Sequence, residues 1–599
     1  MANVKFNSIP EMIRDRAKTY STKEVFRFID KKTEELSSIN WNEFVDGSEK
    51  VSKALLGSGY GENSKIGIFS NNIPEWTIAD VGILDIRAIV VPFFATASKE
   101  QCKYIIDETE MKLMFVGDKE QLGKALWLLD HTNSLKQIVV FDTEIPLEDK
   151  RCVNFNDFCD IKSSKEIDVK LKDSRAKAAL SDMVTILYTS GTTGEPKGVM
   201  LNNENFIHTF KVHKMRLDLS DKDVSMAFLP LSHIFERTWS FYLMFCGGTN
   251  FYNENPRKVI DVLPIAKPTV MCTVPRFFEK TYEGIQKETE NWPSTKKKIF
   301  NWSIETGAKV SNIRKKGKKI PVLLKIQYNI ADALVLKKLR SIFGGNIRSM
   351  PCSGAALPLY LLKFFHATGI FVNYGYGATE TTATVSCFES DKYEFESCGT
   401  LMPELEVKFS DENEILIKGK IIFQGYYKKP EETKAVLKDG WYYTGDEGYL
   451  TDDGNLVMTD RLKDLMKTSV GKYISPQKLE TLLGQDAMIE QIVVVGDNRK
   501  FVAALIVPVM EQFQAAVEKL GLKFDDVNKM MDDKQVRKLM KERIDKCQDE
   551  LTGYEKVKEF VLLAEPFSIE GGTLTSTLKT KRKVIVKKYA SLIDEMYAG

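Results

Sequence analysis

The sequence stretch best suited to chemistry is a loop of glycine and hydroxyl residues that ends at a lysine. An apolar run at 184–187 predicts a short buried strand, and it leads into Thr189-Ser-Gly-Thr-Thr-Gly-Glu-Pro-Lys197. Glycines let successive backbone N–H groups turn toward one point, hydroxyls add donors, and the lysine adds a mobile positive charge. This combination suits a polyphosphate. It is not the Walker A pattern, because Gly198 follows the lysine; a glycine-rich surface turn is the competing interpretation.

Two later turns carry carboxylates. In Tyr374-Gly-Tyr-Gly-Ala-Thr-Glu380, Tyr376 offers a flat ring for a purine and Glu380 offers oxygen to Mg²⁺. In Gly440-Trp-Tyr-Tyr-Thr-Gly-Asp446, the aspartate is suited to accept hydrogen bonds from ribose hydroxyls. The alternatives are an ordinary exposed carboxylate at a strand end and an aspartate that caps a β-turn.

Two basic segments follow. Asp460-Arg-Leu-Lys463 stands where the composition changes, and a polar interdomain linker is its alternative interpretation. Leu574-Thr-Ser-Thr-Leu-Lys-Thr-Lys-Arg-Lys583 gathers cations beside a threonine-rich turn, and no acidic residue occurs from 573 to 593. A solvated basic helix start would give the same pattern.

The elements around these motifs alternate between strand and helix signals. Short apolar runs predict strands at 65–70, 88–93, 112–116, 137–142, 224–229, 249–252, 269–273, 347–352 and 370–373. Such alternation predicts parallel sheets covered by helices. A polar link is expected at 160–181.

From residue 404 the pattern becomes all-β, with runs at 405–409, 414–417, 420–423 and 455–459 and a hairpin turn at Asp452-Asp-Gly-Asn455. After residue 460 a smaller α/β unit follows, with strands at 491–496 and 501–507 and helices around 510–520, 534–550 and 581–596. We therefore predict an α/β protein: a large N-terminal domain (1–460) of mixed and parallel sheets with a small β-barrel-like part, and a small, mobile C-terminal α/β domain (461–599).

The composition argues against some classes of protein, such as nucleic-acid-binding and zinc proteins. A chain of 599 residues exceeds one core, and its net charge of +2 gives no overall tendency to bind nucleic acid. Nine unpatterned cysteines and five scattered histidines argue for reduced, cytoplasmic thiols and against zinc.

Residues 284–340 hold fourteen Lys and Arg against four Asp and Glu. A solvated helical hairpin and contact with anionic lipid headgroups both fit this stretch.

Taken in this order, the loop at 189–197, the Tyr376–Glu380 turn, Asp446, Arg461 and a late lysine resemble the adenylate-forming superfamily. That superfamily includes acyl-CoA synthetases, luciferases and peptide-synthetase adenylation domains. Four further features look like bacterial long-chain fatty acyl-CoA synthetases: Leu229-Pro-Leu-Ser-His-Ile-Phe-Glu-Arg-Thr238, the basic helical insert at 284–340, Ser353-Gly-Ala-Ala-Leu-Pro358 and the ending Leu-Thr-Ser-Thr-Leu-Lys. The resemblance covers essentially the whole chain.

The resemblance implies ATP, Mg²⁺ and CoA as cofactors or co-substrates of a long-chain fatty acid–CoA ligase. Glu380 would hold Mg²⁺, Thr379 would contact the α-phosphate, and His233 would lie beside the acyl carboxylate. The β,γ-phosphates would be gripped by Thr189, Ser190, Gly191, Thr192, Thr193, Gly194 and Lys197.

It also assigns the remaining nucleotide and CoA contacts. Tyr376 would pack on adenine next to Gly377, and Asp446 and Arg461 would bind the ribose. Gly354 would form the strand-end turn flanking the nucleotide and the acyl chain. Gly471 would line the CoA entry, and Lys463 would lie at the pivot of a lid domain.

One departure from the family pattern concerns the catalytic lysine. Many relatives end in a Gly-Lys pair, whereas Leu578 replaces the glycine in this sequence. Lys579 is the best match, and Lys581 stays an alternative. An aromatic stretch, listed as Phe235, Trp239, Phe241, Tyr242 and Phe245, is the candidate lining of an acyl tunnel, although plain helix core would explain the same spacing.

Other activities and partners stay open. A fatty acyl-AMP ligase that passes its acyl group to a carrier protein, another carboxylic acid–CoA ligase and a non-catalytic protein that keeps the nucleotide fold are the alternatives. By analogy with related enzymes we expect a homodimer as one state. We expect a cytoplasmic location with peripheral contact at the inner membrane face. Acyl chain length and pathway do not follow from the sequence.

Overall fold

The computed structural model describes residues 6–161, 164–189, 196–461, 466–469, 472–549, 551–568, 571–575 and 580–598. The chain divides into two compact units. The first unit comprises Met1–Lys408, Leu416–Thr444 and Leu450–Val457, and the second comprises Phe409–Ile415, Gly445–Tyr449 and Met458–Gly599. Both units combine sheets with helices, so the predicted α/β class is correct.

One sheet of the first unit carries the strand that leads into the glycine-rich loop. Its strand order is β7-β6-β5-β3-β4-β8-β9, and neighbours run parallel except for the antiparallel β8/β9 pair. Runs such as Leu-Met-Phe-Val in β5 are buried on both faces, as a covered parallel sheet requires. The strands are β3 (Lys65–Phe69), β4 (Ile89–Phe93), β5 (Leu113–Val116), β6 (Gln137–Val140), β7 (Cys152–Asn154), β8 (Met183–Thr189) and β9 (Lys197–Asn202). The strand predictions for this region are confirmed.

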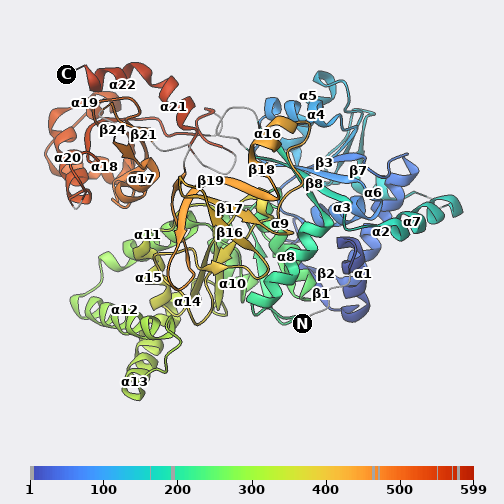
Figure 1. Cartoon of the computed structure of the whole chain (residues 1–599), viewed down its shortest axis with the longest axis horizontal. Coiled ribbons are helices and arrows are strands. Elements are labelled where there is room, and N and C mark those ends of the chain that lie inside the picture. The colour runs from blue at the N-terminus through green and yellow to red at the C-terminus, as the bar shows by residue number, and fades with distance from the viewer. Residues whose placement is uncertain are drawn as a thin grey trace. The chain divides into compact units, whose positions relative to one another are not determined.

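Helices cover both faces of this sheet. α4 (Lys99–Thr109) and α5 (Lys119–His131) contribute to the core on one face (Figure 1). On the other face, Phe115 of β5 packs edge-on against Phe158 of α6 (Phe155–Cys159). Alternate strand residues therefore serve two separate cores.

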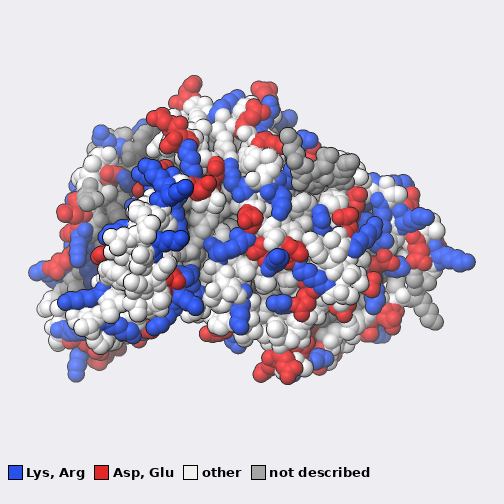
Figure 2. Space-filling model, turned by 90° about the horizontal axis from the view of Figure 1, so that it is seen from below, with Lys and Arg blue, Asp and Glu red and all other residues white. Residues whose placement is uncertain are grey.

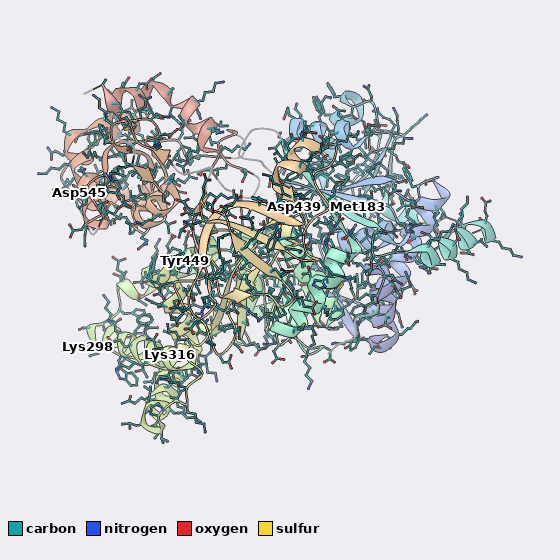
Figure 3. The ribbon with its side chains drawn as sticks, viewed as in Figure 1. Met183, Lys298, Lys316, Asp439, Tyr449 and Asp545 are labelled. Atoms are coloured by element: carbon teal, nitrogen blue, oxygen red, sulfur yellow. The ribbon has the colours of Figure 1, made fainter. Side chains whose placement is uncertain are left out.

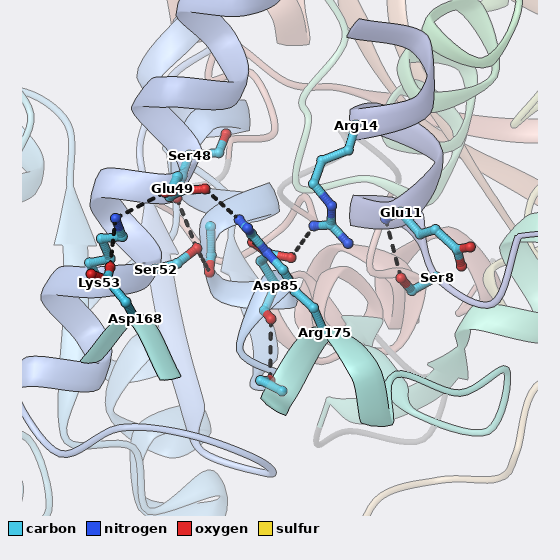
Figure 4. Close-up of polar contacts among 12 residues, drawn as sticks. Ser8, Glu11, Arg14, Ser48, Glu49, Ser52, Lys53, Asp85, Asp168 and Arg175 are labelled. Carbon is cyan, nitrogen blue, oxygen red and sulfur yellow. Dashed lines mark hydrogen bonds and ion pairs between the residues drawn. The ribbon is translucent and has the colours of Figure 1, made fainter. Parts of the chain in front are cut away.

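Partly buried ion pairs join four helices of the first unit (Figure 4). These helices are α1 (Ile9–Tyr20), α2 (Trp41–Gly57), α3 (Pro74–Asp85) and α7 (Lys165–Lys177). Asp85 accepts hydrogen bonds from Arg14 of α1 and from Arg175 of α7, and Arg175 also donates to Glu49 of α2 at 2.9 Å. The polar link expected at 160–181 leads to β8 as predicted, and most of it is the helix α7, whose Arg175 is held by α2 and α3.

The first unit contains two smaller sheets of four strands each. One has the order β10-β11-β1-β2, and the other has β12-β13-β14-β15. Their strands are β10 (Val224–Ala227), β11 (Thr249–Tyr252), β1 (Glu24–Ile29), β2 (Leu36–Asn40), β12 (Ser349–Cys352), β13 (Phe371–Tyr376), β14 (Ser386–Cys387) and β15 (Thr400–Leu401). The strand predicted at 269–273 is wrong, because this segment makes isolated bridges at Val270 and Thr273 instead.

The remaining compact helices of the first unit pack around these sheets. They are α8 (Asn203–Arg216), α9 (Ile234–Phe245), α10 (Val259–Ala266), α11 (Pro275–Glu290) and α15 (Leu359–Ala367), with short 3-10 turns η1 (Pro256–Lys258) and η3 (Thr379–Thr381). In α9 every residue except Phe235 is buried. The helix α9 is therefore part of the core. Among the described residues, none of the helices is long and apolar enough to cross a membrane.

A helical arm projects from the first unit, as Figure 1 shows. We call residues 294–341 the α12–α13 arm; it contains α12 (Ser294–Arg314), α13 (Val322–Ala331), a π-helical stretch η2 (Asp332–Leu336) and α14 (Lys337–Ser341). Gly317, at a φ of 61°, and Pro321 separate α12 from α13. Figure 3 labels Lys298 in the first turns of α12 and Lys316 just after its end. The helices predicted for this basic stretch are confirmed.

A curled sheet corresponds to the predicted barrel-like part. It has the order β16-β17-β19-β18, with β20 pairing with β19. Its elements are β16 (Glu406–Phe409), β17 (Glu414–Lys418), α16 (Pro430–Val436), β18 (Leu437–Lys438), β19 (Trp441–Leu450) and β20 (Leu456–Arg461). Gly454, at a φ of 77°, makes the predicted turn between β19 and β20. The strand predicted at 420–423 is wrong, because these residues form a turn.

The C-terminal part of the second unit is a small α/β fold with cores on both faces of its sheet. The sheet has the order β23-β24-β25, and a β21-β22 pair precedes it. Ala504 and Ile506 face one core, and Leu505 and Val507 face the other. Its elements are β21 (Met466–Lys467), β22 (Tyr473–Ile474), α17 (Pro476–Leu483), β23 (Ile489–Val495), β24 (Val502–Pro508), α18 (Met510–Lys519), α19 (Val527–Asp532), α20 (Lys534–Cys547), β25 (Val557–Leu562), α21 (Arg582–Lys588) and α22 (Ala590–Tyr597). The predicted strands and helices are present.

Candidate active site

A strand pair forms the base of the glycine-rich loop. Thr189, the last residue of β8, and Lys197, the first residue of β9, pair directly across the antiparallel ladder. The ladder thus brings two of the predicted phosphate-binding residues side by side. The loop residues between them, Ser190, Gly191, Thr192, Thr193 and Gly194, lie outside the described residues.

Tyr426 links the lysine of this loop to the carboxylate of the other glycine-rich turn. The ammonium of Lys197 lies 5.1 Å from the centre of the Tyr426 ring. The phenol of the same tyrosine donates a hydrogen bond to Glu380 Oε1 at 2.9 Å. Because Lys197, Tyr426 and Glu380 come from distant parts of the sequence, their meeting at one place supports a common ligand site. We call these three side chains the Lys197–Tyr426–Glu380 cluster.

Backbone pairing holds Tyr426 in this position. The N–H of Tyr427 donates to the carbonyl of Gly198 at 2.7 Å, and the N–H of Gln424 donates to that of Met200 at 2.9 Å. Residues 424–427 therefore run alongside β9. Sequence reasoning missed Tyr426, since a tyrosine 46 positions beyond Glu380 carries no local spacing signal; its place after a glycine, in Gly425-Tyr-Tyr, was the one hint.

The turn that carries Glu380 is sterically tight. A Cβ atom on Gly377 would lie 1.6 Å from the carbonyl oxygen of Ala383, so this position requires glycine. Thr382 and Ala383 have φ angles of 48° and 85°, a region that residues with side chains rarely adopt. Backbone strain of this kind gathers at functional sites, where the surroundings hold it. The predicted nucleotide residues Tyr376 and Thr379 are both buried beside this turn.

The turns after β12 and β13 lie at one edge of their sheet. The two strands are parallel, with Cys352 paired to Tyr374. Gly354, at a φ of 93°, follows β12, and Gly377 follows β13. The carboxyl ends of parallel strands are where α/β sheets bind ligands. Gly354 therefore forms the strand-end turn that was predicted for it.

Two cavities lie along β12 and β13. The smaller, of about 30 Å³, is lined by Ser353 and Gly375 at the strand ends and by Phe235 of α9. The larger, of about 350 Å³, is lined by side chains from β12, β13 and the α12–α13 arm. The two share four lining residues, which are Leu217, Trp239, Pro351 and Asn373. They therefore lie next to each other, and together they extend from the strand ends to the arm.

Of the five aromatic residues predicted to line an acyl tunnel, two line these cavities and three do not. Phe235 lines the smaller cavity, and Trp239 lines both. Phe241, Tyr242 and Phe245 instead pack in the core against rings of α8, including Phe206, His213 and Phe210. Helical spacing alone places aromatics on a helix, but it does not tell which side of a fully buried helix adjoins a cavity.

His233 lies at the start of α9, close to the smaller cavity. Its Nδ1 accepts a hydrogen bond from the N–H of Phe235 at 3.2 Å, so the ring caps the helix. Its ring centre is 6.5 Å from that of Phe94. The structure thus places His233 two residues from a cavity-lining side chain, although it is not among the residues that line either cavity.

Two other histidines on the cavity walls are neutral at neutral pH. Burial lowers the pKa of His213 to about 4, partly opposed by the carbonyl of Thr209, which its ring contacts at 2.7 Å. Burial likewise lowers the pKa of His366 to about 4. His213 lines the smaller cavity and His366 the larger. These walls therefore present uncharged rings.

The second unit holds the predicted ribose-binding pair. Arg461, at the end of β20, donates from Nε to Asp446 Oδ1 of β19 at 3.0 Å. The Asp446 side chain is 5% exposed and that of Arg461 is 46% exposed. Glu414 accepts a hydrogen bond from the N–H of Gly445 at 2.8 Å and so holds the backbone just before the aspartate. The turn predicted before Asp446 is wrong, because Gly445 and Asp446 both lie inside the strand β19. The structure brings the two predicted residues into direct contact.

Three further predicted residues, Lys463, Gly471 and Lys579, lie outside the described residues. Lys581, the alternative to Lys579, precedes α21, and its N–H donates to the carbonyl of Thr573 at 2.8 Å. The choice between the two lysines therefore stays a prediction.

Comparison with known proteins gives two family matches that cover most of the chain. Residues 13–427 match the family described as AMP-binding enzyme, and residues 463–599 match the AMP-binding enzyme C-terminal domain. The long-chain-fatty-acid–CoA ligase 5 of Rattus norvegicus is 31% identical over 592 residues, which are 93% of this chain and 84% of that protein. The long-chain-fatty-acid–CoA ligase FadD15 of Mycobacterium bovis is 29% identical over 548 residues, or 91% and 89%.

Solved structures share the fold at lower identity. The A domain of the carboxylic acid reductase from Segniliparus rugosus, in complex with AMP and a co-purified carboxylic acid, superposes with a TM-score of 0.75 at 20% identity, covering 99% of this chain and 95% of that one. The O-succinylbenzoate coenzyme A synthetase of Bacillus subtilis, in complex with ATP and a magnesium ion, gives a TM-score of 0.67 at 17% identity, covering 96% and 98%.

Proposed function

Because the chain belongs to the AMP-binding enzyme family, we propose that it is an AMP-forming ligase that joins a long-chain fatty acid to coenzyme A. In the first half-reaction a carboxylate oxygen of the acid bonds to the α-phosphorus of ATP, and pyrophosphate leaves. In the second, the CoA sulfur bonds to the acyl carbon of acyl-AMP, and AMP leaves. The thioester acyl-CoA is the product. No protein nucleophile takes part in this sequence.

The two adjoining cavities along β12 and β13 are the observation that carries the choice of substrate. The larger volume, about 350 Å³, lies within the range of small-molecule sites, roughly 300–1,000 Å³. Its lining combines apolar side chains such as Leu219, Ile370 and Phe388 with charged ones such as Arg216, Arg314 and Arg348. A carboxyl group beside Ser353 and Gly375 would leave its tail to run past Trp239 toward the arm. The long-chain ligases among the relatives support the same choice.

Charge neutralisation is the main task of the site, since a carboxylate and a triphosphate repel each other. Lys197 would meet the β,γ-phosphates together with Thr189 and the loop that follows it, and Thr379 would contact the α-phosphate. Tyr426 holds Glu380 by its hydrogen bond and so orients the carboxylate without changing its charge. Preorganised charges of this kind act without reorganisation when the bond forms.

The residues present fit a magnesium ion that arrives with the nucleotide. Mg²⁺ is commonly held by one or two carboxylates plus substrate phosphates rather than by a full protein cage. Glu380 supplies one such carboxylate, and no group of three or more His, Cys, Asp or Glu among the described residues could form a cage. When bound, the ion would offset phosphate charge, with Glu380 as its protein ligand.

The second unit would bind the sugar and close the site. Asp446 and Arg461, in contact at 3.0 Å, are suited to hold the ribose hydroxyls, and Tyr376 is suited to pack on adenine. Residues 461–599 would act as a lid that excludes water from the acyl-AMP, with Lys463 at the pivot and Gly471 at the CoA entry. Lys579, or else Lys581, would offset charge between the carboxylate and the α-phosphate.

The test distinguishes transfer of the acyl group to free CoA from transfer to a carrier protein. The full chain is incubated with ATP, Mg²⁺ and palmitate, with and without free CoA, and both AMP and palmitoyl-CoA are measured. We expect AMP and palmitoyl-CoA to form in equal amounts when CoA is present. Palmitate-dependent pyrophosphate exchange without any palmitoyl-CoA would contradict the proposal and favour the carrier-protein alternative.

A further inference from the structure

The outer face of α13 exposes a row of large aliphatic side chains. Val322 is 77% exposed, Ile326 is 52%, Ile330 is 50% and Leu334, in η2, is 47%. Their spacing of four residues places them on one side of the helix. Leu323, next to Val322, is 70% exposed and widens the row. Surface aliphatic residues are common singly, but a contiguous set of this kind marks an interaction site.

The rest of α13 explains why this row stays uncovered. Leu324 and Tyr328 are half-buried and Ala331 is buried, and these residues lie on the side that meets α12. One side of α13 is thus occupied by the packing of the arm itself. On the other side, no neighbour among the described residues hides the aliphatic side chains.

Basic side chains surround the exposed row. The α12–α13 arm contains thirteen Lys and Arg but two acidic residues, Glu305 and Asp332. Asp332 is already paired with Arg340 at 2.7 Å. Exposed lysines precede, interrupt and follow the row, and they are Lys318, Lys319, Lys325, Lys337 and Lys338. In Figure 2, which views the molecule from below, uncharged side chains with Lys and Arg around them form a knob left of centre.

We propose that the α12–α13 arm is a docking surface for an anionic lipid bilayer. A helix with aliphatic residues on one side and lysines beside them lies in the interface, with its apolar side among the acyl chains. The lysines add attraction to anionic headgroups. α13 has ten residues, far fewer than the roughly 20 needed to span a bilayer, so the arm lies on the membrane.

Charge decides between a bilayer and a second copy of the chain. A two-fold symmetric contact would bring the same patch of both copies together. Two arms that each carry a large excess of lysine would then face each other and repel. An anionic surface instead complements the arm. The bilayer is therefore the occupant that this surface fits.

Docking would also bring the larger cavity to the lipid surface. Gly307, Val310, Ser311 and Arg314 of α12 and Tyr328 of α13 line that cavity. A long-chain acid concentrates in bilayers, so an arm resting on lipid would meet the acid where it is abundant. This second step rests on the proposed function, whereas docking itself does not.

The experiment measures co-sedimentation of the full chain with vesicles, without acid, ATP or CoA. Vesicles of phosphatidylcholine alone are compared with vesicles that also contain phosphatidylglycerol, at low and high salt. We expect binding to the anionic vesicles that weakens as salt rises. Two double variants, K318E/K319E and V322S/I326S, should each weaken this binding roughly tenfold or more. Absence of binding by the unmodified chain would overturn the proposal.

Helix α7 supplies matched controls. Lys165 and Lys172 are exposed, and Val169 is 66% exposed. K165E/K172E and V169S change the same charges and a similar aliphatic residue on another helix, and they should leave vesicle binding unchanged. Equal losses for α7 and arm variants would overturn the proposal, since binding would then follow net charge alone.

Sedimentation velocity without lipid tests whether a second copy of the chain occupies the exposed row instead. We expect the arm variants and the unmodified chain to have the same oligomeric state. Conversion of a dimer to a monomer by V322S/I326S would overturn the proposal in favour of a second copy. Because the vesicle assay needs no substrate, an inactive but vesicle-binding chain would contradict only the proposed function.

Discussion

The Lys197–Tyr426–Glu380 cluster and the α12–α13 arm use charge in opposite ways. In the cluster, a lysine and a carboxylate meet on one tyrosine, and strand pairing and a strained turn fix their positions. On the arm, lysines of one sign stand on exposed helix faces beside aliphatic residues. The difference teaches that a reaction needs a few charges at fixed positions, whereas a surface contact needs many charges whose sum matters.

The largest effect should come from removing the carboxylate charge of the cluster. Glu380→Gln keeps an oxygen that can accept the hydrogen bond of Tyr426, but it loses the charge proposed to hold Mg²⁺. We expect kcat/KM for MgATP to fall about 100- to 1,000-fold, the usual cost of losing one electrostatic group at a reacting centre. Steady-state kinetics over a Mg²⁺ titration measures this.

Glu412→Gln is the matched control, because Glu412 is an exposed carboxylate outside the proposed site. It should leave the kinetics unchanged. Unchanged Mg²⁺ dependence in Glu380→Gln would break the comparison, since the cluster would then have no more effect than a surface carboxylate.

The next effect is a pH dependence of the free energy of unfolding, which should come from the buried interior and not from the arm. The folded pKa values of His213 and His366 are about 4, below the ordinary value of 6.5. The unfolded chain therefore binds more protons between these values, and the free energy of unfolding falls as pH drops from about 6.5 to 4. The loss amounts to about 3 kcal/mol per histidine at the low end.

Urea denaturation of the full chain at a series of pH values measures this loss. His213→Gln should flatten the pH dependence by about half, because His366 keeps its share. Vesicle binding through the arm's lysines should persist through the part of this range in which the chain stays folded, since it does not depend on the buried histidines. An unfolding free energy that does not change across the range would refute the burial argument.

A smaller effect should follow from the phenol of Tyr426. Tyr426→Phe keeps the ring beside Lys197 but removes the hydrogen bond to Glu380. A hydrogen bond to a charged group contributes about 1.5–3 kcal/mol, so we expect at least a tenfold loss of kcat/KM. A double variant with Glu380→Gln should lose little more than Glu380→Gln alone, because Tyr426 acts through that carboxylate. Additive losses would show that the two act independently.

The smallest effect should be that of the arm's charges on the rate of acyl-CoA formation. K318E/K319E should leave the rate of acyl-CoA formation unchanged when the acid is supplied in solution without vesicles. The same assay applied to K165E/K172E gives the baseline. A large loss specific to the arm variant would show that the arm takes part in the reaction and would remove the distinction between the two regions.

Much of the fold followed from local pattern, because strands buried on both faces appear as short apolar runs. The β1–β2 hairpin escaped prediction, since β2, Leu-Ser-Ser-Ile-Asn, is polar and partly exposed. The run at 420–423 is apolar for another reason: Ile421 is buried in a turn that accepts a hydrogen bond from Thr382. An apolar run reports burial, and burial is not limited to strands.

The site was predictable where its residues share a motif and not where they meet across the chain. Asp446 and Arg461 were assigned to one ligand, and they do touch. Tyr426 was not foreseen, because its role depends on the pairing of residues 424–427 with β9. An acyl tunnel along α9 was predicted, but the other walls of the cavities were not foreseen, since they come from two strands and the arm. Contacts between distant segments are set by tertiary packing, which leaves no local spacing.

ATP–pyrophosphate exchange without CoA isolates the step in which the acid is joined to AMP. The full chain is assayed with single acids from acetate to stearate, at a fixed MgATP concentration. We expect acid-dependent exchange that is strong with palmitate and weak with acetate, since only a long tail would reach the cavity beyond Trp239. Exchange that is as fast with acetate as with palmitate, or absent with every acid, would contradict it.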